Sequence, residues 1–109
     1  MKEVKLAKIE SAKFGYFQDR EFLFGLILGF SGQGWSVGCG GRYTISMSKD
    51  CKWKSQEERK EWMEKTMQFT YDIIQQAGVD SVEKLKGIPV EVTLENNAFK
   101  SFRILTEVL

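Results

Sequence analysis

The segment from Ser31 to Arg42, SGQGWSVGCGGR, contains the residues best suited to hold a ligand. A phosphate-binding loop needs several backbone N–H groups that converge with a helix N-terminus or a cation. Here the glycines leave the backbone bare and Arg42 supplies the cation, while Trp35 offers a ring for stacking on a base or a protein partner. The order of the glycines matches no known phosphate-loop motif, so a tight hairpin with a bulge is the competing interpretation. The candidate ligand- or partner-binding residues are Trp35, Gly38, Gly40, Arg42 and Tyr43.

A catalytic site is not indicated by the residue types. The chain has no histidine, which excludes imidazole acid/base chemistry, Ser-His and Cys-His dyads and zinc sites that need imidazole. Cys39 has no base near it in the sequence and is better explained as a small buried hydrophobic residue. The acids of the segment after Ser55 alternate with Lys60 and Lys65, which is typical of a solvated helix face. We therefore expect a protein that is not an enzyme, with no cofactor and no metal.

Lysines near the N-terminus provide a second, different candidate. Lys5 and Lys8 would lie on or near a first strand, where they could follow a phosphate backbone. Lysines that protect an edge strand from aggregation explain them equally well. With 16 basic and 15 acidic residues the net charge is +1, which lowers the weight of nucleic-acid binding without excluding one basic face.

The length of 109 residues predicts a single domain, 1–109, large enough for its own core. Cys39 and Cys51 are expected to be free thiols in a reducing cytosol, with a disulfide between them as the alternative. No segment has the length of a membrane span or of a signal peptide, so we expect a cytoplasmic protein. The sequence leaves homo-oligomer formation open.

The element that must position these residues is an amphipathic helix from Ser55 to Ala77. Ser55 and Glu58 have capping-box spacing, and Gly78 follows the last apolar residue, where a left-handed cap would end the helix. At 100° per residue the apolar side chains form one broad arc, which fits a helix lying across a sheet. The members of this arc are Trp62, Met63, Thr66, Met67, Phe69, Thr70, Ile73, Ile74 and Ala77.

Strands are expected on both sides of this helix. Val4 to Glu10 alternates, with Val4 and Leu6 on one face and lysines on the other. Phe22 to Ser31 is apolar on both faces, which predicts a central strand, and its glycine face is the expected approach of the helix. After a turn at residues 32–34, Trp35 to Ser48 is the partner strand, interrupted by a bulge or a bare stretch at residues 38–41.

The C-terminal third predicts a short helical turn followed by a hairpin. Ser81 to Leu85 is the turn, stopped by Gly87, and a strand opens at Pro89. The last strand, Lys100 to Val108, follows the turn Glu95-Asn96-Asn97. A three-residue loop would place Phe102 and Ile104 on the face of Val92, and we prefer it to the two-residue alternative because it buries more apolar surface. The predicted fold class is α+β, a mainly antiparallel β-sheet with one long amphipathic helix on one face and a C-terminal β-hairpin.

The block GIPVEVTLENNAFKSFRILTEVL, Gly87 to Leu109, together with FSGQGWSVG, Phe30 to Gly38, resembles small uncharacterised proteins encoded by bacteriophages and prophages. This resemblance implies an origin in a bacterial host and no established activity. On it we expect a non-enzymatic binding protein, an accessory or anti-defence factor that occludes a host protein or sequesters a small nucleotide-like ligand. The alternative is a single-stranded nucleic-acid-binding module of phage replication or recombination, working through Lys5 and Lys8.

Overall fold

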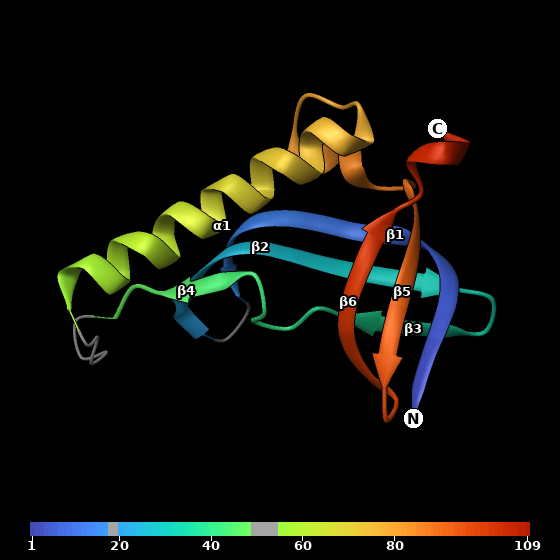
Figure 1. Cartoon of the computed structure of the whole chain (residues 1–109), viewed down its shortest axis with the longest axis horizontal. Coiled ribbons are helices and arrows are strands. Elements are labelled where there is room, and N and C mark those ends of the chain that lie inside the picture. Colours follow the sequence, from blue (N-terminus) through green and yellow to red (C-terminus); the bar gives the residue numbers. More distant parts are fainter. Residues whose placement is uncertain (18–19, 49–54) are drawn as a thin grey trace.

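A computed structural model describes residues 1–17, 20–48 and 55–109 of the chain. It has the predicted α+β fold, with a mainly antiparallel sheet, one long helix and a C-terminal hairpin (Figure 1). Along the chain the elements are β1 (Lys2–Phe17), β2 (Arg20–Gly32), β3 (Trp35–Gly38), β4 (Thr44–Ser46), α1 (Gln56–Ala77), the 3₁₀ helix η1 (Val82–Leu85), β5 (Pro89–Glu95), β6 (Ala98–Ile104) and the 3₁₀ helix η2 (Thr106–Val108).

The sheet is curled because its longest strand, β1, pairs with a different strand along each of its two parts. The strand order is β3-β2-β1-β5-β6, with β4 also paired to β2. The first part of β1, up to Lys8, pairs with β5, and the part from Lys8 onward pairs with β2. A register shift between Ile9 and Ser11 lies just past this exchange of partners, and such bulges bend a strand. As a result β5 and β6 run steeply across β2 and the second part of β1, as Figure 1 shows.

The core fills the inside of this curl. Phe30, from β2, is fully buried, and its ring stacks on Phe99 of β6 with centroids 5.3 Å apart. Phe102, also from β6, contacts the same ring at 4.9 Å. The other fully buried side chains come from β1, β2, η1, β5 and β6, and they are Ile9, Leu26, Leu28, Leu85, Val90, Val92 and Ile104.

The face of β1 that points into the core is not the face that carries Val4 and Leu6. Leu6 is 70% exposed, whereas Ala7 and Ile9 are buried. The choice is made by β5, because Ala7 lies directly opposite Val90 in the ladder and paired residues of antiparallel strands share a face. Lys5, on this inner face, lies with its ammonium 5.2 Å from the centre of the Trp35 ring.

Helix α1 begins and ends where the sequence predicts, but it packs on the other face of β2. The Ser55 hydroxyl accepts the N–H of Glu58 at 3.1 Å, and Gly78 closes the helix in the left-handed region with φ of 71°. Ile73 and Ala77 are buried in the same cluster as Leu26, Leu28 and Phe30, so the predicted approach to the glycine face is wrong. The large side chains of this face form the core, and burying the apolar arc of the helix against them removes the most apolar surface from water.

The β5 and β6 hairpin combines both of the predicted registers. Asn96 and Asn97 both have positive φ and form a two-residue turn, so the preferred three-residue loop is wrong. A bulge then leaves Lys100 without a partner in the ladder and restores the pairing of Phe102 with Val92. Through this bulge Phe99 and Phe102 both contact Phe30, a combination that no single regular register gives.

The partner strand of β2 is broken into β3 and β4. The predicted turn before it is present, since Gly32 pairs with Trp35 across Gln33 and Gly34. Residues 39–43 leave the ladder as a turn, and Gly40 takes a φ of 60° there. Cys39 remains anchored, because its N–H donates to the Leu28 carbonyl at 3.0 Å and its buried Sγ accepts the Leu28 N–H at 3.2 Å. Cys51 and the rest of the segment 49–54 lie outside the described residues, so the expected state of this thiol is not tested.

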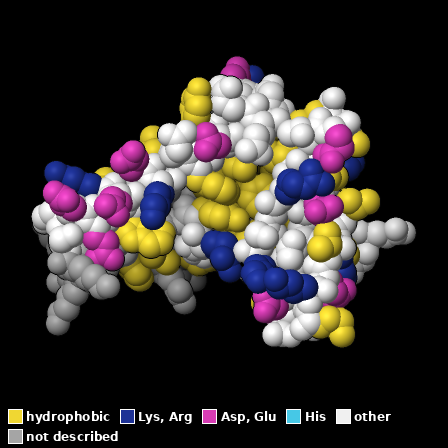
Figure 2. Space-filling model, viewed as in Figure 1, with side chains coloured by type: hydrophobic (Ala, Val, Ile, Leu, Met, Phe, Trp, Pro, Cys, Tyr) yellow, Lys and Arg dark blue, Asp and Glu magenta, His cyan; other side chains and the backbone are white. Residues whose placement is uncertain are grey.

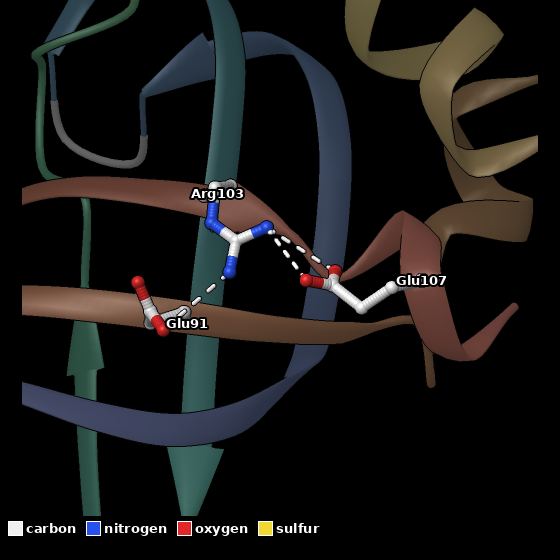
Figure 3. Close-up of polar contacts among 3 residues, drawn as sticks. All are labelled: Glu91, Arg103 and Glu107. Atoms are coloured by element: carbon white, nitrogen blue, oxygen red, sulfur yellow. Dashed lines mark hydrogen bonds and ion pairs between the residues drawn. The ribbon is translucent and has the colours of Figure 1, made fainter.

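The C-terminus is held by the clamp drawn in Figure 3. Arg103, on β6, donates to both carboxylate oxygens of Glu107 at 3.2 Å and lies 3.6 Å from the carboxylate of Glu91 on β5. The predicted last strand therefore ends at Ile104, and η2 turns back beside it. The predicted turn before β5 is the short helix η1, which Gly87 follows with φ of 91°.

Candidate functional site

A cleft of about 240 Å³ opens between the turn after β3 and the first half of α1. Two of its lining side chains are cations, three are aromatic and two are threonines. Among the residues that the structure describes, no carboxylate lines it. The lining residues are Arg42, Tyr43, Thr44, Trp62, Lys65, Thr66 and Phe69.

The turn of residues 39–43 presents one wall of this cleft. Thr44 fastens the turn, since its hydroxyl and its N–H both donate to the Gly41 carbonyl, at 2.7 Å and 3.2 Å. The Tyr43 carbonyl accepts the Leu26 N–H at 3.1 Å. This close approach needs a bare neighbour, because a Cβ on Gly25 would lie 2.5 Å from the Tyr43 oxygen. The turn therefore carries Arg42 outward at its tip.

Tyr43 forms the floor. Its ring stacks on Phe69 with centroids 4.3 Å apart and an interplanar angle of 20°, which ties the turn to α1. Burial raises the pKa of the Tyr43 hydroxyl to about 12, with a smaller contribution from Cys39. The phenol therefore remains neutral and able to donate a hydrogen bond throughout the physiological range.

Helix α1 provides the opposite wall. Trp62 and Lys65 are three residues apart and so lie on the same side of the helix. The Lys65 ammonium lies 5.1 Å from the centre of the Trp62 ring, a cation–π geometry. Trp62 remains 47% exposed. The Thr66 hydroxyl donates to the Trp62 carbonyl at 2.9 Å, so it is engaged with the backbone.

The cations of the cleft are held over rings and not by acids. The Arg42 guanidinium lies 5.8 Å from the centre of the Phe99 ring. Within residues 1–17, 20–48 and 55–109, neither Arg42 nor Lys65 takes part in an ion pair. Both charges are thus available to an anion, beside an exposed indole.

The predicted site residues are only partly brought together. Arg42 and Tyr43 line the cleft, and Gly40 shapes the turn that carries them. Gly38 lies in β3 opposite Gly29, and Trp35 packs against the core beside Lys5; neither lines the cleft. The helix residues Trp62, Lys65, Thr66 and Phe69, and Thr44, were not identified from the sequence. The spacing of Trp62 and Lys65 is the signal that would have indicated half of this set.

The two lysines of the nucleic-acid alternative lie on different faces of β1. Lys5 shares the inner face with Ala7, and its ammonium is 3.9 Å from Glu3. Lys8, on the alternate face, is exposed. A nucleic-acid strand that lies along one face of β1 would therefore reach only one of these two lysines. It would have to pass over the edge of β1 to contact both.

Other possible sites carry little chemistry. Burial raises the pKa of the Cys39 thiol, which keeps it protonated and weakly nucleophilic. Among the described residues, no group of three or more His, Cys, Asp or Glu side chains could hold a metal ion. Across the same part of the chain, no helix is both long enough and apolar enough to pass through a membrane.

No protein-family model, curated protein or solved structure matches this chain. The resemblance to phage-encoded proteins therefore stays a prediction, and the function has to be argued from the cleft.

Proposed function

We propose that the protein is a non-enzymatic binding protein that sequesters a small nucleotide-like ligand in the cleft between Arg42 and Trp62. The observation that carries the proposal is the pairing of two cations, Arg42 and Lys65, with a half-exposed indole, with no carboxylate among the described lining residues. We place this activity in the cytoplasm of a bacterial host, in keeping with the predicted phage origin.

The chemistry of the lining fits a flat anion. A nucleobase that stacks on the Trp62 ring would gain about 1–3 kcal/mol of binding free energy, whichever base it is. A phosphate near Arg42 would gain charge-assisted hydrogen bonds from a planar fork of donors. A cationic ligand or a bare metal ion would instead be repelled by the two positive charges.

The same lining does not favour turnover. The hydroxyls of Thr44 and Thr66 both donate to backbone carbonyls of their own segments. Tyr43 stays protonated because of its burial. The groups beside a bound phosphate would thus hold it and would not act as base or nucleophile, which supports sequestration over hydrolysis.

Isothermal titration calorimetry with adenosine and guanosine nucleotides tests the proposal. We expect Trp62→Ala and Arg42→Ala each to weaken binding about tenfold or more, in line with the loss of one stacking or charge-assisted contact. Tyr71→Ala is the matched control, since Tyr71 is 59% exposed on the same helix but does not line the cleft. Equal binding by Trp62→Ala and by the native protein would disprove this site.

A further inference from the structure

A group of three cations extends from the cleft, and only one of the three, Arg42, lines it. Lys2 comes from β1, Arg42 from the turn after β3, and Lys100 from β6. Lys2 is directly opposite Glu95 in the ladder, and the Lys100 ammonium is 2.8 Å from the Glu95 carboxylate. Arg42 lies over the ring of Phe99, the residue before Lys100. We call Lys2, Arg42 and Lys100 the rim cations.

The bulge in β6 is what makes this grouping. In a regular ladder Lys100 would pair with a residue of β5, but the register shift leaves it as the extra residue. Its side chain then reaches along the strand to Glu95, beside Lys2. A bulge that re-aims one side chain in this way is a feature often found next to a binding site.

The rim cations carry more positive charge than their neighbours cancel. Within the described part of the chain, Glu95 is the carboxylate that is paired within the group, which leaves these four side chains with a net charge of +2. The nearby Lys100 holds the pKa of Lys2 below its usual value. The pKa of Lys100 is raised, chiefly by its hydrogen bond to Glu95, while Arg42 acts against this. Like charges drawn from three segments repel one another, and Glu95 offsets only part of this repulsion.

The size of the cleft sets how a ligand would be arranged. Pockets that enclose a whole small molecule measure about 300–1,000 Å³. The cleft, at about 240 Å³, is smaller, so a base and its sugar would fill it. The phosphates of such a ligand would extend out of the cleft beside Arg42. Arg42 lines the cleft and is also one of the rim cations. Figure 2 shows Lys and Arg side chains side by side next to an apolar hollow on this face.

We infer that the ligand is a nucleotide with two or more phosphates in series, its base on Trp62 and its phosphates extending from Arg42 to Lys100 and Lys2. This inference rests on the proposed function and adds the phosphate count as the feature that is recognised. A longer nucleic-acid strand is less favoured, because Glu3 follows Lys2 and the whole chain has a net charge of only +1.

The test compares AMP, ADP and ATP, and the matching guanosine series, by calorimetry without divalent cations. We expect each added phosphate to tighten binding to the native protein about fivefold to tenfold, equivalent to one further charge-assisted contact. The double variant Lys2→Gln/Lys100→Gln should bind the monophosphate with an affinity within about twofold of the native protein, since Arg42 remains. It should lose the gain in affinity that each further phosphate brings. Glu95→Gln should enlarge the increments, because it removes the opposing charge.

Lys84→Gln/Lys86→Gln is the matched control, since it removes two charges at η1, away from the rim, and should keep the native increments. Thermal melting of each variant checks that the fold is intact. Monophosphate binding with no gain for ADP or ATP would overturn the inference and leave the proposed function standing. Failure of every nucleotide to bind would overturn both. A trinucleotide that binds more tightly than ATP, with steep salt dependence, would replace both with single-strand binding.

Discussion

The two halves of α1 have the same amphipathic pattern and opposite surroundings. In the second half Thr70, Ile73 and Ala77 are buried against the sheet. In the first half Trp62 and Met63 lie on the same apolar arc, yet they are 47% and 39% exposed. Figure 1 shows the first turns of the helix reaching past β4, where the large sheet strands no longer lie beneath it.

This difference shows that an apolar arc indicates which side chains a helix could bury. It does not show which of them the tertiary structure buries. The second half stabilises the fold. The first half leaves aromatic rings and the aliphatic parts of side chains exposed beside the turn that carries Arg42. The cleft lies between this half of the helix and that turn. Stability and the proposed binding thus depend on different halves of one helix, and substitutions should separate them.

The largest expected effect is on the packed half. Ile73→Ala should lower the free energy of unfolding by about 2–5 kcal/mol, because it leaves a cavity beside Leu26 and Leu28. Met63→Ala, on the exposed half, should change it by no more than about 0.5 kcal/mol. Urea unfolding followed by circular dichroism measures both. Similar losses for the two variants would contradict the division of the helix.

The next effect is on the turn that faces the exposed half. Gly25→Ala should cost about 1–3 kcal/mol, because its φ is 154° and a Cβ there would press on the backbone of Tyr43 and Thr44. Ligand binding should weaken at the same time, since the turn carries Arg42. Gly34→Ala is a useful comparison, because its φ is also positive but no atom lies within 4 Å of the added Cβ. Equal unfolding midpoints for these two variants would show that the close approach of Tyr43 does not matter.

A smaller and more local effect is expected at the start of α1. Ser55→Ala removes the hydroxyl that accepts the Glu58 N–H, a loss of about 1 kcal/mol for a typical N-cap. With little packing beneath it, the first turn should open locally while the packed half stays closed. Amide hydrogen exchange should therefore speed up in residues 56–60 and stay unchanged in 70–77. Uniform acceleration along the whole helix would mean that both halves open as one unit.

The smallest effect concerns the clamp of Figure 3, which is exposed in the same way as the first half of α1. The pKa of Glu107 is lowered, first by a backbone N–H and then by Arg103. A lowered pKa means that the carboxylate stabilises the fold above its unfolded pKa and that this contribution is lost as pH falls through the folded value. Glu107→Gln should therefore be slightly less stable than the native protein near pH 7. The difference in urea midpoint should shrink toward about pH 3, and a difference that does not change with pH would exclude this ion pair as its cause.

The candidate site was half predictable, for a reason visible in its residues. Arg42 and Tyr43 were identified because glycines around a cation and rings are a local signal in one segment. Trp62 and Lys65 lie some twenty residues further on, and their apolar and charged positions fit an ordinary helix surface equally well. Trp35 was chosen for its place at a hairpin tip, but it lies over Gly32 and packs on the core. Which indole stays exposed depends on the packing of segments distant in sequence.

The sequence by itself determined the elements whose signals are local. The limits of α1, its Ser55 and Gly78 caps, the Gln33-Gly34 turn and the α+β class all depend on contacts between residues a few positions apart. The tertiary structure decided which face of β1 is inside, which face of β2 the helix covers, and the bulge that frees Lys100. These are choices between alternatives with almost the same local energy. They are settled only when β1 exchanges β2 for β5 and the sheet curls around Phe30.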